Sequence, residues 1–135
     1  MRHTTVQIKI NQSIVYAHDG TKDRWQWQGT GQLWDLNTYF KLAYQGPHGL
    51  QEIKVDKQTP AYATIHQGQT RLAFNIAQTT ECLYPTPQGT WELQVVTQDL
   101  TWQQEANSGQ VRLTYELYLG QEKLGNYDFQ LIYED

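Results

Sequence analysis

The 135-residue sequence is poor in cysteine, in charge and in long apolar runs. Cys82 is the single cysteine, which excludes an internal disulfide. No apolar run is long enough for a membrane-spanning helix, and the first residues lack the apolar core of a signal peptide. Charged residues make up only 18%, and the 10 basic residues are scattered among 14 acidic ones, whereas nucleic-acid binding needs clustered Lys and Arg. We therefore expect a cytoplasmic protein with no membrane or nucleic-acid partner.

Signatures of metal and enzyme sites are also missing. Four histidines occur, and no pair has the spacing of metal ligands; they are His3, His18, His48 and His66. No glycine-rich loop precedes a helix and no nucleophile elbow is present, so phosphate-loop and hydrolase motifs are excluded. Cys82 has no neighbours in sequence that would activate a thiol. The sequence predicts no metal and no cofactor, and it identifies no reaction.

Aromatic residues are plentiful, with 5 Trp and 9 Tyr, and the chain alternates apolar and polar residues with a period of two. Such alternation is typical of strands with one buried face, and no segment keeps a helical period. The apolar rows include Val6–Ile8–Ile10, Leu72–Phe74–Ile76, Trp91–Leu93–Val95, Val111–Leu113–Tyr115–Leu117 and Tyr127–Phe129–Leu131–Tyr133. The length is that of one domain, 1–135.

Short turn signals separate these rows, among them Asp19-Gly20, Pro87-Gln88-Gly89 and Gly120-Gln121. They leave about ten strands and no room for a crossover helix. A meander of this length must close on itself or fold into a sandwich. We predict an all-β fold, a single up-and-down antiparallel barrel of about eight to ten strands with little or no helix.

The turn at Pro87 sets the register of the hairpin formed by residues 79–97, and with it the side chains that face inward. Pro87 forbids a primed two-residue turn, so we expect a three-residue loop that ends in a bulge at Gly89. That register places Glu81 opposite Val95 and turns the carboxylate inward. A slip of one residue would turn Tyr84 and Cys82 inward instead.

Two other hairpins carry register predictions. The Gln67-Gly68 turn predicts Ala63 opposite Leu72 and Ala61 opposite Phe74, and two inward alanines would leave space in the interior.

In the last hairpin, a two-residue loop would set Leu113 against Asp128. A longer loop or a bulge at Gly125 restores Leu113 against Phe129 and brings Tyr115 against Tyr127.

The aromatics and one carboxylate are the candidate ligand-binding residues. A pocket for a flat or apolar ligand would draw on Trp25, Trp27, Tyr39, Glu81, Trp91 and Tyr115. The competing interpretation is that the large side chains simply fill a small barrel. A buried Glu81 would have a raised pKa and could serve as an acid, a base or an anchor.

The C-terminal half resembles a known family. The run Tyr84-Pro85-Thr86-Pro87-Gln88-Gly89, then Thr97, then LTYELYLGQEKLGNYDFQLIY from Leu113 to Tyr133, looks like the YwiB-like bacterial proteins of unknown function. The N-terminal VQIKI and the run GTGQLW fit more loosely. The resemblance implies a calycin-like β-barrel, the architecture of lipocalins and fatty-acid-binding proteins, in a bacterial cytoplasm. It brings no catalytic or ligand residues.

Three functions follow as hypotheses. The first is a barrel that binds a small, partly apolar or aromatic ligand. The second is a protein-interaction or homo-oligomeric module, such as a homodimer, that uses outward aromatics: Tyr16, Tyr62 and Tyr118. The third, an enzyme with Glu81 and Tyr84 or a threonine as an acid–base pair, has no motif to support it.

Overall fold

The computed structural model describes residues 3–57 and 62–135, which form ten antiparallel strands. The strands are β1 (Thr4–Tyr16), β2 (Lys22–Asp35), β3 (Tyr39–Gly46), β4 (Gly49–Asp56), β5 (Tyr62–Gln67), β6 (Thr70–Asn75), β7 (Thr80–Thr86), β8 (Gly89–Gln104), β9 (Ser108–Leu119) and β10 (Glu122–Glu134). In these two ranges there is no helix, so none that could cross a membrane.

All ten strands belong to one sheet in the order β6-β5-β4-β3-β2-β1-β10-β9-β8-β7. Strands adjacent in sequence pair with each other, and β1 also pairs with β10, so the edges of the sheet are β6 and β7. These edges approach each other, and the Thr80 hydroxyl of β7 donates a hydrogen bond to the Ala73 carbonyl of β6. The result is a nearly closed up-and-down barrel, which confirms the predicted fold class.

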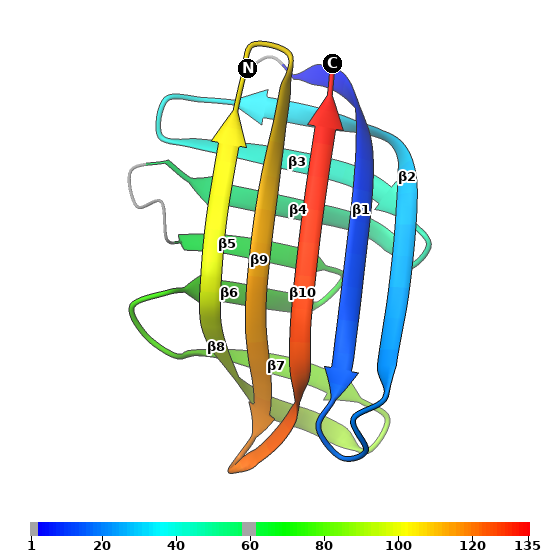
Figure 1. Ribbon diagram of the computed structural model, residues 1–135, viewed down its shortest axis with the longest axis vertical. Coiled ribbons are helices and arrows are strands. Elements are labelled where there is room, and N and C mark those ends of the chain that lie inside the picture. Colours follow the sequence, from blue (N-terminus) through cyan, green and yellow to red (C-terminus); the bar gives the residue numbers. More distant parts are fainter. Residues whose placement is uncertain (1–2, 58–61) are drawn as a thin grey trace.

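The barrel is flattened into two layers (Figure 1). In the front layer, β8, β9, β10, β1 and β2 run along the long axis, and β3 to β7 cross behind them at a steep angle. Strand β2 passes from one layer to the other, because it pairs with β3 only through Gly31–Asp35. A Cβ on Gly31 would lie 2.4 Å from Ile8 Cδ1 and 2.7 Å from the Ala43 carbonyl, so the crossing requires glycine.

The core lies between the two layers and is built mainly from alternate residues of the strands, as the alternation predicts. Its fully buried members include Val6, Ile8, Ile10, Phe40, Leu42, Ile53, Val55, Phe74, Val95, Val111, Leu113 and Leu131.

The β9–β10 hairpin has a bulge, which is one of the two predicted alternatives. The register shifts between Lys123 and Gly125, which sets Tyr127 opposite Tyr115 and Phe129 opposite Leu113. The extra residue keeps the apolar rows of both strands on the inner face.

The β7–β8 prediction was wrong by one residue. The turn has two central residues, Pro87 and Gln88, and Cys82 lies opposite Leu93 while Glu81 lies opposite Gln94. Gly89 has a φ of 128°, a conformation that glycine tolerates, and this allows a short turn through proline. Glu81 is therefore exposed and Cys82 is buried. The observed register is the more stable one because it buries a small thiol instead of a carboxylate.

The β5–β6 prediction was wrong by two residues. The turn is Gly68-Gln69, so Ala63 lies opposite Phe74 rather than Leu72. A shift of two keeps the same residues inward, and Ala63 is buried as expected. Ala61 lies outside the described residues.

Candidate functional site

A cavity of about 300 Å³ opens along one side of the barrel. It lies where the first half of β2, Lys22–Thr30, pairs with β1 but not with β3. The gap between the layers is thus bordered by β2 on one side and by the β3–β4 and β5–β6 hairpins on the other. The lining residues are Gln12, Ile14, Trp25, His48, Gln51, Ile65, Gln67, Leu72, Tyr115 and Phe129.

The polar part of the lining is mostly glutamine. Gln12, Gln51 and Gln67 each occupy an inward position that continues an apolar row of β1, β4 or β5. Because alternate residues of a strand share a face, the three amides are directed to the same side of the sheet as the core. They converge on the cavity from both layers of the barrel.

Trp25 and Tyr115 supply the aromatic walls. Tyr115 stacks on Tyr127 with ring centroids 5.0 Å apart and planes within 6°, and its other neighbour is Phe74 at 4.8 Å. Burial raises the pKa of Tyr115, and the nearby Tyr127 and Cys82 raise it further. The phenol therefore keeps its proton at neutral pH and can act as a hydrogen-bond donor.

Gln51 is oriented by a neighbour. The Tyr44 hydroxyl donates a hydrogen bond to Gln51 Oε1, which fixes the oxygen and leaves the amide NH2 as the group free to donate. Burial raises the pKa of Tyr44, so this donor also stays protonated. The remaining polar lining residue, the exposed His48, comes from the β3–β4 turn.

No Asp, Glu, Lys or Arg side chain lines this cavity. Within residues 3–57 and 62–135, no three His, Cys, Asp or Glu side chains are grouped as metal ligands. The cavity thus offers apolar surface, aromatic faces, three amides, a hydroxyl and the His48 imidazole, a combination typical of small-molecule pockets.

The structure brings together two of the six predicted ligand-binding residues, Trp25 and Tyr115. Trp27 packs against the core and stacks on Tyr44 at 4.8 Å. Tyr39 lies under Lys54 Nζ, which is 4.3 Å from the ring centroid, on the outer face of the sheet.

Glu81 and Trp91 do not reach the cavity either. Glu81 is exposed on the outer face of β7, and Trp91 is 43% exposed near the β7–β8 turn, where it lies opposite Tyr84. Glu81 and Tyr84 are three residues apart on one strand, so their side chains point to opposite faces and cannot form an acid–base pair.

The glutamines are the cavity-lining residues that the sequence did not lead us to expect. A signal was present: Gln12 interrupts the inward row Val6–Ile8–Ile10 and is followed by Ile14 in the same phase. A polar residue in the phase of a buried row indicates an interior that is partly polar. Ile65, Leu72 and Phe129 cannot be distinguished from ordinary core residues in the sequence.

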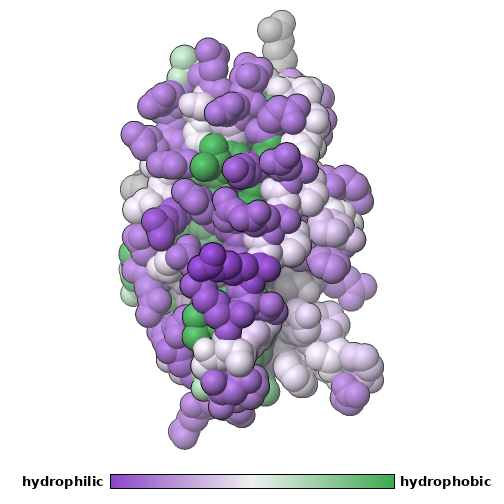
Figure 2. Space-filling view, turned by 45° about the vertical axis from the view of Figure 1, so that its right-hand side comes forward, coloured by the Kyte–Doolittle hydropathy of each residue, from purple (hydrophilic) through white to green (hydrophobic). Residues whose placement is uncertain are grey.

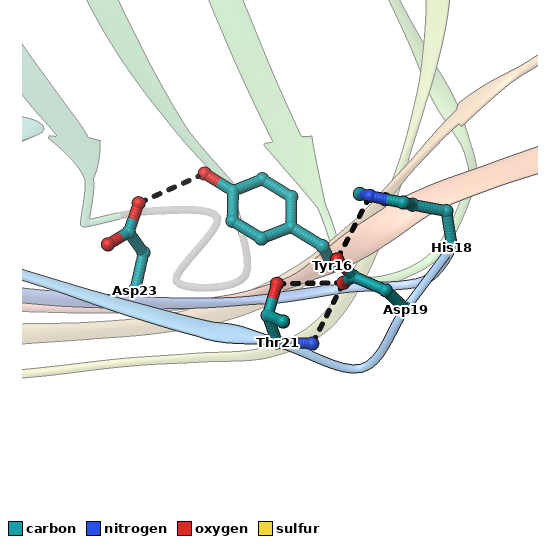
Figure 3. Close-up of polar contacts among 5 residues, drawn as sticks. All are labelled: Tyr16, His18, Asp19, Thr21 and Asp23. Carbon is teal, nitrogen blue, oxygen red and sulfur yellow. Dashed lines mark hydrogen bonds and ion pairs between the residues drawn. The ribbon is translucent and has the colours of Figure 1, made fainter.

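Hydrogen-bonded side chains surround the β1–β2 turn (Figure 3). Asp19 Oδ1 accepts hydrogen bonds from the backbone N–H of Thr21 at 2.9 Å and from its hydroxyl at 2.7 Å. The Tyr16 hydroxyl donates to Asp23 at 3.3 Å. Burial raises the pKa of Tyr127, and the nearby Tyr16 raises it further.

Residues 8–131 match the model of a domain of unknown function, DUF1934. The chain belongs to this family. No curated protein matches the chain by sequence.

Among solved structures, the crystal structure of the ywiB protein from Bacillus subtilis is similar, with a TM-score of 0.78. The match has 17% sequence identity and covers 98% of this chain and 92% of the other. The predicted resemblance to YwiB-like proteins is confirmed, and so is the calycin-like barrel. At this identity the similarity establishes the fold alone.

Proposed function

We propose that the barrel binds a small, uncharged, partly apolar molecule in the cavity between β2 and the β3–β4 and β5–β6 hairpins. The observation that carries the proposal is the composition of the lining, in which three inward glutamines, Tyr115 and His48 interrupt otherwise apolar walls. Ligand pockets typically combine apolar and aromatic surface with a few convergent polar groups. The expected cytoplasmic setting remains part of the proposal.

The size and chemistry of the cavity narrow the ligand class. A volume of about 300 Å³ is at the lower end of the usual range for small-molecule pockets. A charged ligand would lose its hydration and find no counter-charge, which is costly. A flat ring carrying a carbonyl or hydroxyl group would stack on Trp25 and bond to the amides.

Native mass spectrometry of the protein purified gently from its own host tests the proposal. We expect an additional small mass that disappears on denaturation. Two results together would contradict the proposal. They are a protein that carries no additional mass under these conditions and a protein that shows no saturable binding of a neutral solvatochromic dye.

A matched pair of variants locates the ligand. Ile65→Trp fills the cavity, whereas Leu83→Trp adds the same ring at a position that is 63% exposed on β7. We expect Ile65→Trp to weaken dye or ligand binding at least tenfold and Leu83→Trp to leave it within twofold. Equal effects of the two variants would place the ligand elsewhere.

A second candidate, a homo-oligomeric or protein-interaction module, is favoured by the β7–β8 hairpin. Leu83, Tyr84 and Trp91 are exposed there by 63%, 45% and 43%, and β7 is an edge of the sheet. The aromatics expected to serve this role instead have partners of their own: Tyr16 bonds to Asp23 and Tyr118 to Glu116. Light scattering of the protein and of Trp91→Ser tests this function, since a dimer that dissociates in the variant would support it.

A further inference from the structure

A second hollow lies on the front layer across β2, β1 and β10, next to the cavity, with which it shares the lining residues Gln12 and Trp25. It has a volume of about 240 Å³ and is centred on Ser13 of β1, which pairs with Arg24 of β2 and with Asp128 of β10. The hollow exists because the short serine is flanked by long side chains. Figure 2 shows this side of the molecule, whose surface is mostly hydrophilic. We call this feature the Ser13 groove.

Positive charge is concentrated in the Ser13 groove although the whole chain has a net charge of -4. Lys22, Arg24 and Arg112 line it, with Asp128 as the one carboxylate. Asp128 Oδ2 is already paired with Arg112 at 3.3 Å. Among the described residues, Lys22 and Arg24 make no ion pair, so their charges are available to a ligand.

Amides complete the lining. Asn11 pairs with Gln26 on one side and Gln130 on the other, so three amide side chains form a row next to Arg24, Ser13 and Asp128. They add neutral hydrogen-bond donors beside the cations.

The spacing of the cations indicates the size of the ligand. Arg24 is on β2 and Arg112 is on β9, three strands away, which places their backbones about 14 Å apart. One tetrahedral oxyanion cannot engage both guanidinium groups unless both side chains fold inward. A chain of two or three oxyanions spans the groove with the side chains extended.

We propose that the Ser13 groove binds a small molecule that carries two or more phosphate groups. Guanidinium groups bind phosphate through paired hydrogen bonds and are the residues best suited to it, while Lys22 adds a point charge. Three cations are too few for a nucleic-acid duplex, whose binding rests on many phosphate contacts. The cations that carry the proposal do not line the barrel cavity, so the proposal does not rest on a ligand there.

Calorimetric titration with inorganic tripolyphosphate at low salt tests the proposal. Arg24→Gln should weaken binding at least tenfold, because it removes a charge-assisted contact. Lys9→Gln is the matched control, since Lys9 is an exposed cation on the same face of β1 that does not line the groove. We expect this control to stay within twofold of the parent protein.

Asp128→Asn gives a test in the opposite direction. It releases Arg112 and removes a repulsive carboxylate, so tripolyphosphate should bind several times more tightly. A nucleoside triphosphate that binds much more tightly than tripolyphosphate would identify nucleotides as the source of the phosphates, whereas equal affinity would identify the phosphates alone.

Several results would overturn the proposal. They are the absence of binding at millimolar tripolyphosphate, equal losses in Arg24→Gln and Lys9→Gln, and citrate binding as tightly as tripolyphosphate. The last two would show general attraction of anions to a cationic surface.

Discussion

Cys82 is packed against the core while its neighbour Glu81 is in solvent, and this difference in burial decides the faces of β7. Burial is also the main reason that the pKa of the Cys82 thiol is raised, and a backbone hydrogen bond from Arg71 offsets only part of the effect. A thiol held protonated and covered reacts slowly with electrophiles.

We expect Cys82→Ala to lower the free energy of unfolding by about 1 kcal/mol, because it leaves a small void in the core. Glu81→Gln, at an exposed position, should change it by less than about 0.5 kcal/mol. Urea denaturation of both variants measures the difference, and reaction of Cys82 with a thiol reagent in the parent protein should require unfolding. A larger loss of stability in Glu81→Gln than in Cys82→Ala would instead support the register in which Glu81 points inward.

Asp19 orders the β1–β2 turn through its two hydrogen bonds from Thr21, which are the main causes of its lowered pKa. The pKa of Asp19 in the folded protein lies below the ordinary 3.8. The ionised carboxylate therefore stabilises the folded turn above that value, and this stabilisation is lost as the pH falls through the folded-state pKa. We expect the Thr21 amide resonance in NMR spectra to titrate below pH 4. Asp19→Asn keeps a carbonyl acceptor without the charge, so its Thr21 resonance should not titrate there. A titration that survives in the variant would assign it to another group.

At the scale of elements, the bend of β2 depends on Gly31. We expect Gly31→Ala to cost about 1–3 kcal/mol of stability, because the added methyl group would overlap Ile8 and the Ala43 carbonyl. Gly46→Ala is the matched control, since its Cβ would have no neighbour closer than 3.6 Å, an ordinary contact. Thermal and urea unfolding compare the two variants, and equal losses would show that β2 can move to accommodate a side chain.

At the scale of the whole molecule, the two edges of the sheet, β6 and β7, meet at a seam. The hydrogen bond from the Thr80 hydroxyl to the Ala73 carbonyl crosses it. Thr80→Val keeps the shape and strand propensity of the residue but removes this bond. It should cost about 1–2 kcal/mol and speed amide exchange along β6 and β7.

Thr86→Val serves as the control for the seam. Thr86 also donates from its hydroxyl to a carbonyl, that of Gly89 at 2.5 Å, but within the exposed β7–β8 hairpin. Its loss should change stability by less than about 0.5 kcal/mol. If both variants had the same effect, the seam would contribute no special stability.

Some pairings could be inferred locally and others could not. The predicted bulge before Gly125 followed from the need to keep Leu113 and Phe129 on one face, and the structure confirms it. The turn at Pro87 could not be settled in this way, because the rule that proline disfavours a primed two-residue turn predicted a three-residue loop, whereas the structure has a two-residue turn with Pro87 as its first central residue. The packing of the rest of the barrel determines the register, because it buries Cys82 in the core and leaves Glu81 in solvent.

The sequence by itself determined the strand content and the inward rows of most strands, β7 excepted, since alternation and turn residues act over a few positions. Only the tertiary structure decided which rows meet. It brought Gln12, Gln51 and Gln67 to one cavity and gathered Arg24 and Arg112 around Ser13. These groupings depend on the separation of β2 from β3 and on the pairing of β1 with β10, which join residues far apart in the chain.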